Sequence, residues 1–367
     1  MSDNCFAQYC IRGLKKIYVP SERVFAAFYR LSNGQMVHVR DRFREYRFTM
    51  NALMALHQAR AHGNEIFLDV ESDYRALLTR VDERTGSLDL AATLWTGRSL
   101  GTEIPPYVTA LFRTIVSNAP TANRLSAKAL GWLITACLSG DEEYRGSAVA
   151  LGKLALGRYL HPKSSLVREI PTGPRRLWAS FSAHSYVAYA LLLLARKTGE
   201  GWARDAGLRI ARALVRLQAP QGLWGYMYHV PTGRVVDYYP AYSVHQDAYA
   251  PFFLTEAIDQ GFAEFKEPLL RGFRWVLGQN ELGHCMVEPR YQVVWRSIIR
   301  KEPNATIVKA LRRVLSTYVG GQSRPKAPDS LKIDRQCWSF EMALPLYVFS
   351  GRTDLPEILD AAPFSSN

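Results

Sequence analysis

Cysteine is scarce in this sequence, and the cysteines form no motif. The chain has 367 residues but only five cysteines, at positions 5, 10, 137, 285 and 337. No two of them have the C-x-x-C spacing of zinc ribbons and dithiol redox sites. We therefore expect a reducing compartment and no metal site.

Long hydrophobic runs are also missing. The longest apolar stretch, residues 186–195, is far shorter than the about 20 residues that a membrane helix needs. No apolar run of the kind found in signal peptides precedes Lys15. These absences predict a cytoplasmic protein without a membrane span.

Several common enzyme motifs do not occur. The sequence has no P-loop, no Rossmann glycine fingerprint after a strand, no HExxH and no G-x-S-x-G. Nucleotide-driven and zinc-protease chemistry are therefore not expected, and we predict no cofactor.

Acidic residues are outnumbered, with 33 Asp and Glu against 46 Lys and Arg and a net charge of +13. A basic surface attracts anions. The cations are scattered, with short clusters at 40–47 and 309–313, and no nucleic-acid-binding motif accompanies them. We expect an anionic small molecule or oligosaccharide as substrate, rather than nucleic acid.

Helical periodicity dominates what is present. Hydrophobic residues make up 48% of the chain, and they recur at three- and four-residue spacing. This pattern predicts helices at 45–61, 70–81, 87–96, 105–117, 121–138, 142–159, 181–198, 201–218, 244–260, 266–278, 304–314 and 339–349. The clear strand patterns are limited to 225–239, with a turn at 231–233, and 287–298.

About twelve successive helices without alternating strands predict an all-α fold of stacked helix pairs, with short β-hairpin insertions. Six pairs can close into an (α/α)6 toroid whose inner helices form a funnel, although an open solenoid has the same pattern. No linker is evident, so residues 1–367 are interpreted as one domain, with 1–40 as a peripheral N-terminal segment.

Residues 237–281 concentrate groups that can carry chemistry. Proton-transfer groups occur beside aromatic rings that can bind a polyhydroxylated ligand. The candidate catalytic residues are Asp237, Tyr242, His245, Asp247 and Glu281. The alternative is a turn and a capped helix with buried, satisfied polar groups.

Two chemistries fit these candidates. A carboxylate pair such as Asp237 and Asp247 would suit a glycosidase if the two groups lay about 5–10 Å apart. Alternatively, His245 would abstract a proton next to a uronate carboxylate. Asn280 or Arg296 would then neutralise the acid, and Tyr242 would protonate the leaving oxygen, as in lyases or epimerases.

Other segments supply candidate substrate-binding residues. One opens the helix predicted at 181–198, and another precedes the last helix, which in a closed toroid returns beside the first inner helices. With the residues above, the candidates are Trp178, His184, Tyr186, Tyr239, Asn280, Arg296 and Trp338. Capping, core packing and, for Arg300, a surface salt bridge are the structural alternatives.

Residues 214–224 contain Gln218, Gly222 and Trp224 in a Q-x-x-x-G-x-W arrangement. This element resembles one found in squalene- and oxidosqualene-type terpene cyclases, and looser variants occur in helical-toroid glycan enzymes. The resemblance implies a toroid in which the Gln caps the next element and the Trp packs across a helix end. Ala213 replaces the usual aromatic residue, and the D-x-D-D and D-D-x-x-D motifs are missing. The pattern at 245–247 and 279–283 is also similar to bacterial proteins of polysaccharide loci.

Three functions remain open from the sequence. The first is a carbohydrate-active enzyme that hydrolyses, eliminates from or epimerises an acidic oligosaccharide or glycoconjugate. The second is an isoprenoid cyclase-like enzyme whose aromatic residues stabilise carbocations. The third is a helical-repeat scaffold that binds partners on a concave face. A polar funnel favours the first function, a dry aromatic cavity the second and an open groove the third.

Overall fold

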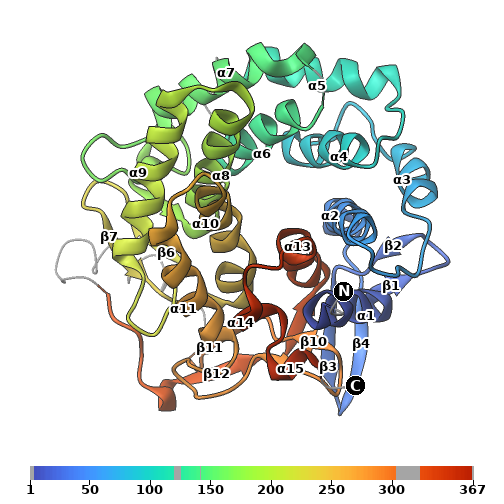
Figure 1. Ribbon diagram of the computed structural model, residues 1–367, viewed down its shortest axis with the longest axis vertical. Helices are drawn as coiled ribbons and strands as arrows, with labels where there is room; N and C mark the ends of the chain where they lie inside the picture. Colours follow the sequence, from blue (N-terminus) through green and yellow to red (C-terminus); the bar gives the residue numbers. More distant parts are fainter. Residues whose placement is uncertain (1–3, 120–124, 141, 303–322, 366–367) are drawn as a thin grey trace.

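The computed structural model describes residues 4–119, 125–140, 142–302 and 323–365. Its helices are arranged as a ring with both chain ends on one side (Figure 1). The helix predicted at 304–314 and the basic cluster at 309–313 lie outside the described residues. Within the described part, no helix is both long and apolar enough to cross a membrane.

The inner ring consists of helices that are buried on almost every side. In α6, for example, every residue except Lys128 is buried. Each inner helix contacts the next, and α13 contacts α2, so the ring is closed. The inner helices are α2 (Arg42–Ala61), α4 (Ser87–Ser99), α6 (Ala127–Leu138), α8 (Phe181–Thr198), α10 (Ala250–Asp259) and α13 (Ser339–Phe349).

The outer helices are amphipathic and bury one face against an inner partner. In α9, Ala203, Ile210 and Leu214 are buried, while Arg209 and Arg216 are exposed. The outer helices are α3 (Val70–Leu78), α5 (Pro106–Asn118), α7 (Arg145–Leu154), α9 (Gly201–Leu217), α11 (Lys266–Val276) and α1 (Cys5–Ile17), which contact α2, α4, α6, α8, α10 and α13 respectively. This arrangement confirms the predicted (α/α)6 toroid.

Helix α1 was not among the predicted helices. Phe6, Tyr9, Cys10, Leu14 and Ile17 have helical spacing and are buried, and α1 contacts α13 and two short C-terminal helices, α14 (Pro356–Leu359) and α15 (Ala362–Ser365). Residues 28–39 form a partly exposed hairpin of β3 (Phe28–Ser32) and β4 (Gln35–Val39). Within residues 1–40, the helix therefore belongs to the core and the hairpin to the surface.

The predicted hairpins are present. β6 (Met227–His229) and β7 (Arg234–Asp237) pair antiparallel across the turn at 231–233, and β5 (Trp178–Ser180) adds a third strand. β9 (Val287–Glu288) pairs with β10 (Val293–Val294), and β11 (Ser297–Arg300) lies between β12 (Leu331–Asp334) and β8 (Ala241–Tyr242). The remaining described strands are β1 (Tyr18–Val19), β2 (Val24–Phe25) and β13 (Gln336–Trp338). β1 pairs with β2, and β13 pairs with β3.

Short helical turns complete the described elements. The segments Ala155–Tyr159 (η2) and His245–Tyr249 (η4) are π-helical and extend α7 and α10. The 3-10 turns are η1 (Glu142–Tyr144), η3 (Pro174–Leu177), η5 (Ala263–Phe265) and η6 (Pro328–Ser330). The predicted helix at 244–260 therefore begins with a π turn.

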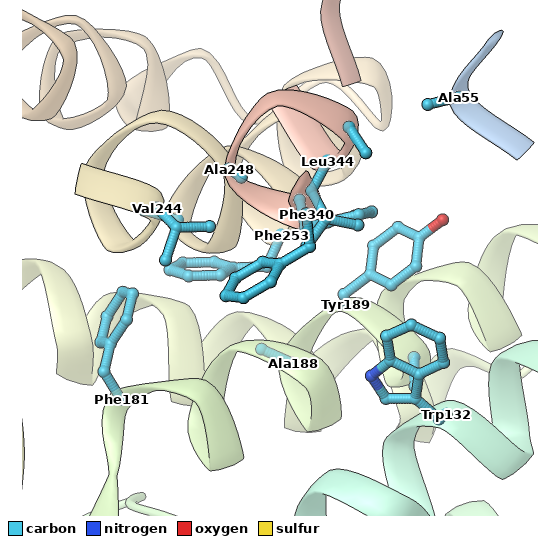
Figure 2. Close-up of a cluster of buried hydrophobic side chains, with 14 of the residues drawn as sticks. Ala55, Trp132, Phe181, Ala188, Tyr189, Val244, Ala248, Phe253, Phe340 and Leu344 are labelled. Atoms are coloured by element: carbon cyan, nitrogen blue, oxygen red, sulfur yellow. The ribbon is translucent and has the colours of Figure 1, made fainter. Parts of the chain in front are cut away.

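Strands β5, β8 and β13 lead directly into α8, η4 and α13. We call the end of the ring at which these inner helices begin the mouth. Figure 2 shows that the interior beneath it is filled by side chains from several inner helices, including Trp132, Phe181, Tyr189, Phe253 and Phe340. The interior of the toroid is therefore a packed core.

The Q-x-x-x-G-x-W element ties neighbouring helix pairs together. The Gln218 amide donates to the carbonyl oxygens of Gly222 at 2.9 Å and Pro268 at 3.0 Å. The Trp224 ring is fully buried and stacks on Phe181, with 5.3 Å between centroids. A Cβ on Gly222 would lie 2.1 Å from the backbone oxygen of Arg271, so this position requires glycine.

Candidate active site

A pocket of about 210 Å³ opens at the mouth. Inner-helix starts contribute Lys128, Ser182, His245, Tyr249 and Phe340, and the adjoining strands and loops contribute Ser180, Tyr226, Tyr242, Val244 and Arg296. Its volume is below the about 300–1,000 Å³ of typical ligand pockets. It therefore suits one ring-sized group better than a long chain.

The electrostatics of the pocket favour an anion. Lys128 and Arg296 are the charged residues of its described lining, and that lining contains no carboxylate. Glu169 lies behind, 3.9 Å from the Lys128 ammonium, and accepts hydrogen bonds from the Ser180 amide and hydroxyl. The starts of α6, α8 and α13 add the partial positive charge of helix N-termini.

His245 lies at the centre of an aromatic cluster. Its ring centroid is 4.9 Å from Phe181, 5.2 Å from Tyr242 and 5.6 Å from Tyr249. The residue is 4% exposed, and its Nδ1 has no hydrogen-bond partner among the described residues. Burial, together with the charges of Lys128 and Arg296, lowers the pKa of His245 to about 3. The imidazole is therefore neutral at pH 7 and able to accept a proton.

Tyrosines beside His245 remain protonated. Burial raises the pKa of Tyr242 to about 12, partly offset by Arg296, and raises the pKa of Tyr249 well above its usual value. Tyr186 packs behind Tyr249, with 5.1 Å between ring centroids. A protonated phenol next to a neutral imidazole gives the pocket one proton donor and one acceptor.

Arg296 is fixed by aromatic rings. Its guanidinium carbon lies 3.6 Å from the ring centroid of Trp338 and 5.0 Å from that of Tyr242. The Trp338 ring also stacks on Phe28 at 5.4 Å and an interplanar angle of 16°. Trp338 therefore supports Arg296 and is absent from the pocket lining.

Two buried carboxyl groups lie behind this lining. Glu341 accepts a hydrogen bond from the Trp338 amide at 2.8 Å, while its Oε1 has no hydrogen bond and lies 3.7 Å from Arg296 Nε. Burial raises the pKa of Glu341 to about 8 against the opposing charge of Arg296. Burial outweighs the ion pair, because a separation of 3.7 Å leaves the pair without a hydrogen bond.

Asp247 is the second of these buried carboxyl groups. It is 2% exposed, and its Oδ1 has no hydrogen-bond partner among the described residues. Burial raises the pKa of Asp247 well above its usual value, and the nearby Glu341 contributes. Burial thus favours the protonated form of both carboxyl groups, and with a pKa of about 8 Glu341 is mainly protonated at pH 7. Neither residue is part of the pocket lining.

Asp237, Glu281 and Asn280 were predicted for the site, but they form hydrogen bonds within and between loops and strands and do not line the pocket. Asp237 Oδ1 accepts hydrogen bonds from Arg300 at 2.6 Å and from the Tyr239 amide at 3.1 Å. Glu281 accepts hydrogen bonds from the Tyr239 hydroxyl and the Trp275 indole, both at 2.9 Å. The Asn280 amide donates to the carbonyl oxygens of Trp275 and His284.

Two candidate residues near the start of α8, His184 and Trp178, also lie outside the pocket lining. His184 is fully buried, and its Nδ1 lies 2.8 Å from the Ser180 carbonyl oxygen. Burial lowers the pKa of His184 to about 4. Trp178 packs against His229 on β5 and β6, with 5.9 Å between ring centroids. Of the predicted residues, Tyr242, His245 and Arg296 line the pocket together.

The sequence interpretation missed Lys128, Tyr226, Tyr249 and Phe340. Lys128 had a visible signal, because it is the single charged residue in the apolar run 127–138. A further acidic residue, Asp89, lies on α4, the inner helix that contacts α6. Its Oδ1 is 3.5 Å from Arg47, and burial raises the pKa of Asp89. Across the described residues, no three His, Cys, Asp or Glu side chains are grouped to hold a metal ion.

Comparison with known proteins identifies the fold but no family. No family model and no curated protein matches the sequence. The structure is similar to cellobiose 2-epimerase from Bacillus thermoamylovorans (TM-score 0.62, 12% identity, covering 94% of this chain and 96% of that chain). It is also similar to an α-1,6-mannanase from Salegentibacter (0.57, 13%, 95% and 98%) and to the unsaturated glucuronyl hydrolase from Bacillus sp. GL1 (0.56, 13%, 99% and 96%). These similarities over nearly the whole chain show that the protein has the (α/α)6 toroid fold of these enzymes.

Proposed function

We propose that the protein is a carbohydrate-active enzyme that binds one acidic sugar unit in the mouth pocket. The enzyme removes the proton from the carbon that bears the carboxylate of that sugar. The outcome is epimerisation of the sugar or elimination of its neighbouring glycosidic oxygen. The observation that carries this proposal is the neutral His245 beside Tyr242, in a pocket whose charged lining residues are Lys128 and Arg296.

Substrate binding follows from the charges of the pocket. The carboxylate of a uronate pairs with Arg296 and Lys128, and the sugar hydroxyls bond to Ser180, Ser182 and the tyrosines. Carbohydrate binding is further supported by the similar structures, which include an enzyme named for an unsaturated glucuronyl substrate and another named for cellobiose. The polar lining is also unlike the dry cavity that an isoprenoid substrate requires.

Proton transfer follows from the protonation states. His245 accepts the proton from carbon, and Arg296 stabilises the charge that develops on the carboxylate oxygens. In epimerisation, the carbon takes a proton from Tyr242 on the opposite face. In elimination, Tyr242 gives its proton to the glycosidic oxygen as the carbon–oxygen bond breaks and a carbon–carbon double bond forms.

The low pKa of free His245 makes it a weak base until substrate binds. Burial is the main cause of this low value, and the charges of Lys128 and Arg296 add to it. A bound carboxylate neutralises these cations and raises the pKa of the imidazole. Acid substrates therefore activate the base, whereas neutral sugars leave it inactive.

The pocket favours elimination or epimerisation over the kind of hydrolysis that uses a pair of carboxyl groups. Such hydrolysis needs two carboxyl groups that face the substrate about 5–10 Å apart. The described lining has none, and Asp247 and Glu341 lie behind it. A hydrolase that used these groups would first have to expose them.

The proposal is tested by a thermal-shift comparison of glucuronate with glucose, followed by product analysis with uronate-terminated oligosaccharides. A ligand at about 100 times its Kd adds about 2.7 kcal/mol to the unfolding free energy. We expect stabilisation by glucuronate alone, and either an unsaturated uronate or an epimer as product. Equal shifts with both sugars, or two saturated hydrolysis products, would contradict the proposal.

A further inference from the structure

We propose that the substrate is part of an acidic polysaccharide, and that its chain leaves the pocket along a cationic track over the start of α2. The track consists of Arg296, Trp338, Arg44, Phe43, Arg42 and Arg80. This inference rests on the proposed function and adds the size and charge of the substrate. It also assigns a role to the basic cluster 40–47, which the pocket does not use.

The track begins at the pocket itself. Arg296 lines the pocket and lies on the Trp338 ring, 3.6 Å from its centroid. The guanidinium carbon of Arg44 lies 5.0 Å from the same centroid. One indole ring thus connects the cation inside the pocket to a cation on the first turn of α2.

Phe43 continues the path on the surface. Its side chain is 76% exposed, which makes it the most exposed of the large hydrophobic residues that the structure describes. It lies between Arg42 and Arg44 in sequence, in the first turn of the inner helix α2. An exposed aromatic ring beside cations offers a stacking surface for a sugar ring.

The far end of the track is a second cavity. It has a volume of about 410 Å³ and is lined by Glu22, Arg42 and Arg80. Arg40 binds the Glu22 carboxylate with two hydrogen bonds of 2.7 and 2.9 Å. Arg40 also makes two hydrogen bonds to the buried Glu45 and is therefore shared between two carboxylates. The two lining arginines still outnumber the single lining carboxylate, so the cavity has a net positive charge.

Arg42 and Arg80 are available to a ligand. Both side chains are exposed. Arg80 donates one long hydrogen bond of 3.5 Å to the Glu22 carbonyl oxygen, and Arg42 has no ion pair among the described residues. Exposed guanidinium groups with few hydrogen bonds can bind the repeated carboxylates of an acidic polysaccharide.

The number and order of these groups indicate the chemistry of the ligand. The pocket holds one ring-sized group, so cations beyond it have a use only if the ligand continues outside. A ligand with one acidic group would occupy Arg296 and leave Arg42 and Arg80 empty. The alternation of arginine with aromatic rings therefore fits a chain with repeated acidic sugars.

The test compares binding of digalacturonate and octagalacturonate by isothermal titration calorimetry, at low and at high salt. The wild-type protein is compared with two double variants. Arg42→Ser/Arg80→Ser removes two charges from the track, and Arg209→Ser/Arg216→Ser removes the same charge from exposed positions on α9. Equal melting temperatures of the three proteins establish that each is folded. The variant Arg42→Lys/Arg80→Lys keeps the charge of the track.

We expect wild type and the α9 variant to bind the octamer about fivefold to tenfold more tightly than the dimer, as two exposed ion pairs can provide. Loss of this advantage in Arg42→Ser/Arg80→Ser alone, with dimer binding unchanged and partial recovery in the lysine variant, supports the track. An equal length advantage in both serine variants, or none in wild type, overturns it. Octamer binding without any chemical conversion would instead contradict the proposed function and leave the track intact.

Discussion

The guanidinium carbon of Arg296 lies 3.6 Å from the ring centroid of Trp338, while its Nε lies 3.7 Å from Glu341 Oε1. Arg296 thus has an aromatic support but, among the described residues, no hydrogen-bonded carboxylate. A partly buried cation without such a partner is ready to bind an anion that enters the pocket. We therefore propose that Arg296 is the residue that selects an acidic ligand.

Arg296→Gln is expected to weaken the binding of an acidic sugar about 10- to 100-fold, because hydrogen bonds to charged groups contribute about 1.5–3 kcal/mol. Binding of the corresponding neutral sugar should hardly change. Isothermal titration calorimetry measures both. Arg290→Gln, at an exposed position near the same strands, is the matched control. Equal weakening in the two variants would exclude a specific role for Arg296.

His245→Gln and Tyr242→Phe are each expected to lower kcat about 100- to 10,000-fold, the usual contribution of general acid–base catalysis. Both changes retain the approximate shape of the side chain, so KM should change little. Single-turnover kinetics measures the chemical step. His284→Gln, at an exposed position, serves as the control. Unchanged rates in both pocket variants would remove these residues from the mechanism.

Glu341 is expected to make the protein less stable as pH rises. Its folded-state pKa of about 8 lies above the ordinary 4.5, so the folded state binds more protons between these values. The contribution of Glu341 to the unfolding free energy is therefore fully present below pH 4.5. It falls by about 1.4 kcal/mol per pH unit up to pH 8.

The variant Glu341→Gln should remove this slope, because glutamine does not titrate and can still accept the bond from the Trp338 amide. Urea unfolding of both proteins between pH 6 and pH 8 measures the difference. Parallel stability profiles would show that Glu341 is already ionised in the folded protein.

Asp237→Asn is expected to reduce the unfolding free energy by about 3–5 kcal/mol, the usual effect of breaking a buried ion pair. Asp237 and Arg300 are 2% and 8% exposed, with 2.6 Å between the paired atoms. Asp259→Asn, which removes a more exposed partner of Arg352, should cost less than about 1 kcal/mol. Urea unfolding measures both. A large loss of kcat in stable, folded Asp237→Asn would return this residue to the catalytic candidates.

The fold could be predicted because helical periodicity is a local signal. The expected bounds 181–198 and 339–349 coincide with α8 and α13, since an apolar segment and its ends are visible within one stretch of sequence. Helix α1 was missed although it has the same spacing. Closure of the ring could not be read from the sequence, because the contact of α13 with α2 joins segments almost 300 residues apart.

The site could be predicted only in part. Tyr242, His245 and Arg296 lie on one pocket, but Asp237 and Glu281, which are close to them in sequence, pair with Arg300 and with Tyr239 and Trp275. Sequence proximity identifies polar groups but not the direction in which each side chain points. The π-helical turn His245–Tyr249, which brings His245 and Tyr249 to the same pocket, has no signal in the hydrophobic pattern.

We propose that the pocket moves a proton on the carbon that bears a carboxylate. Incubation of the protein with uronate-terminated oligosaccharides in deuterated water, followed by mass spectrometry and nuclear magnetic resonance, tests it most directly. We expect either deuterium at that carbon in an epimerised sugar or an unsaturated uronate from elimination. Neither product should form with His245→Gln. Saturated hydrolysis products without deuterium at that carbon, formed equally well by His245→Gln, would contradict it.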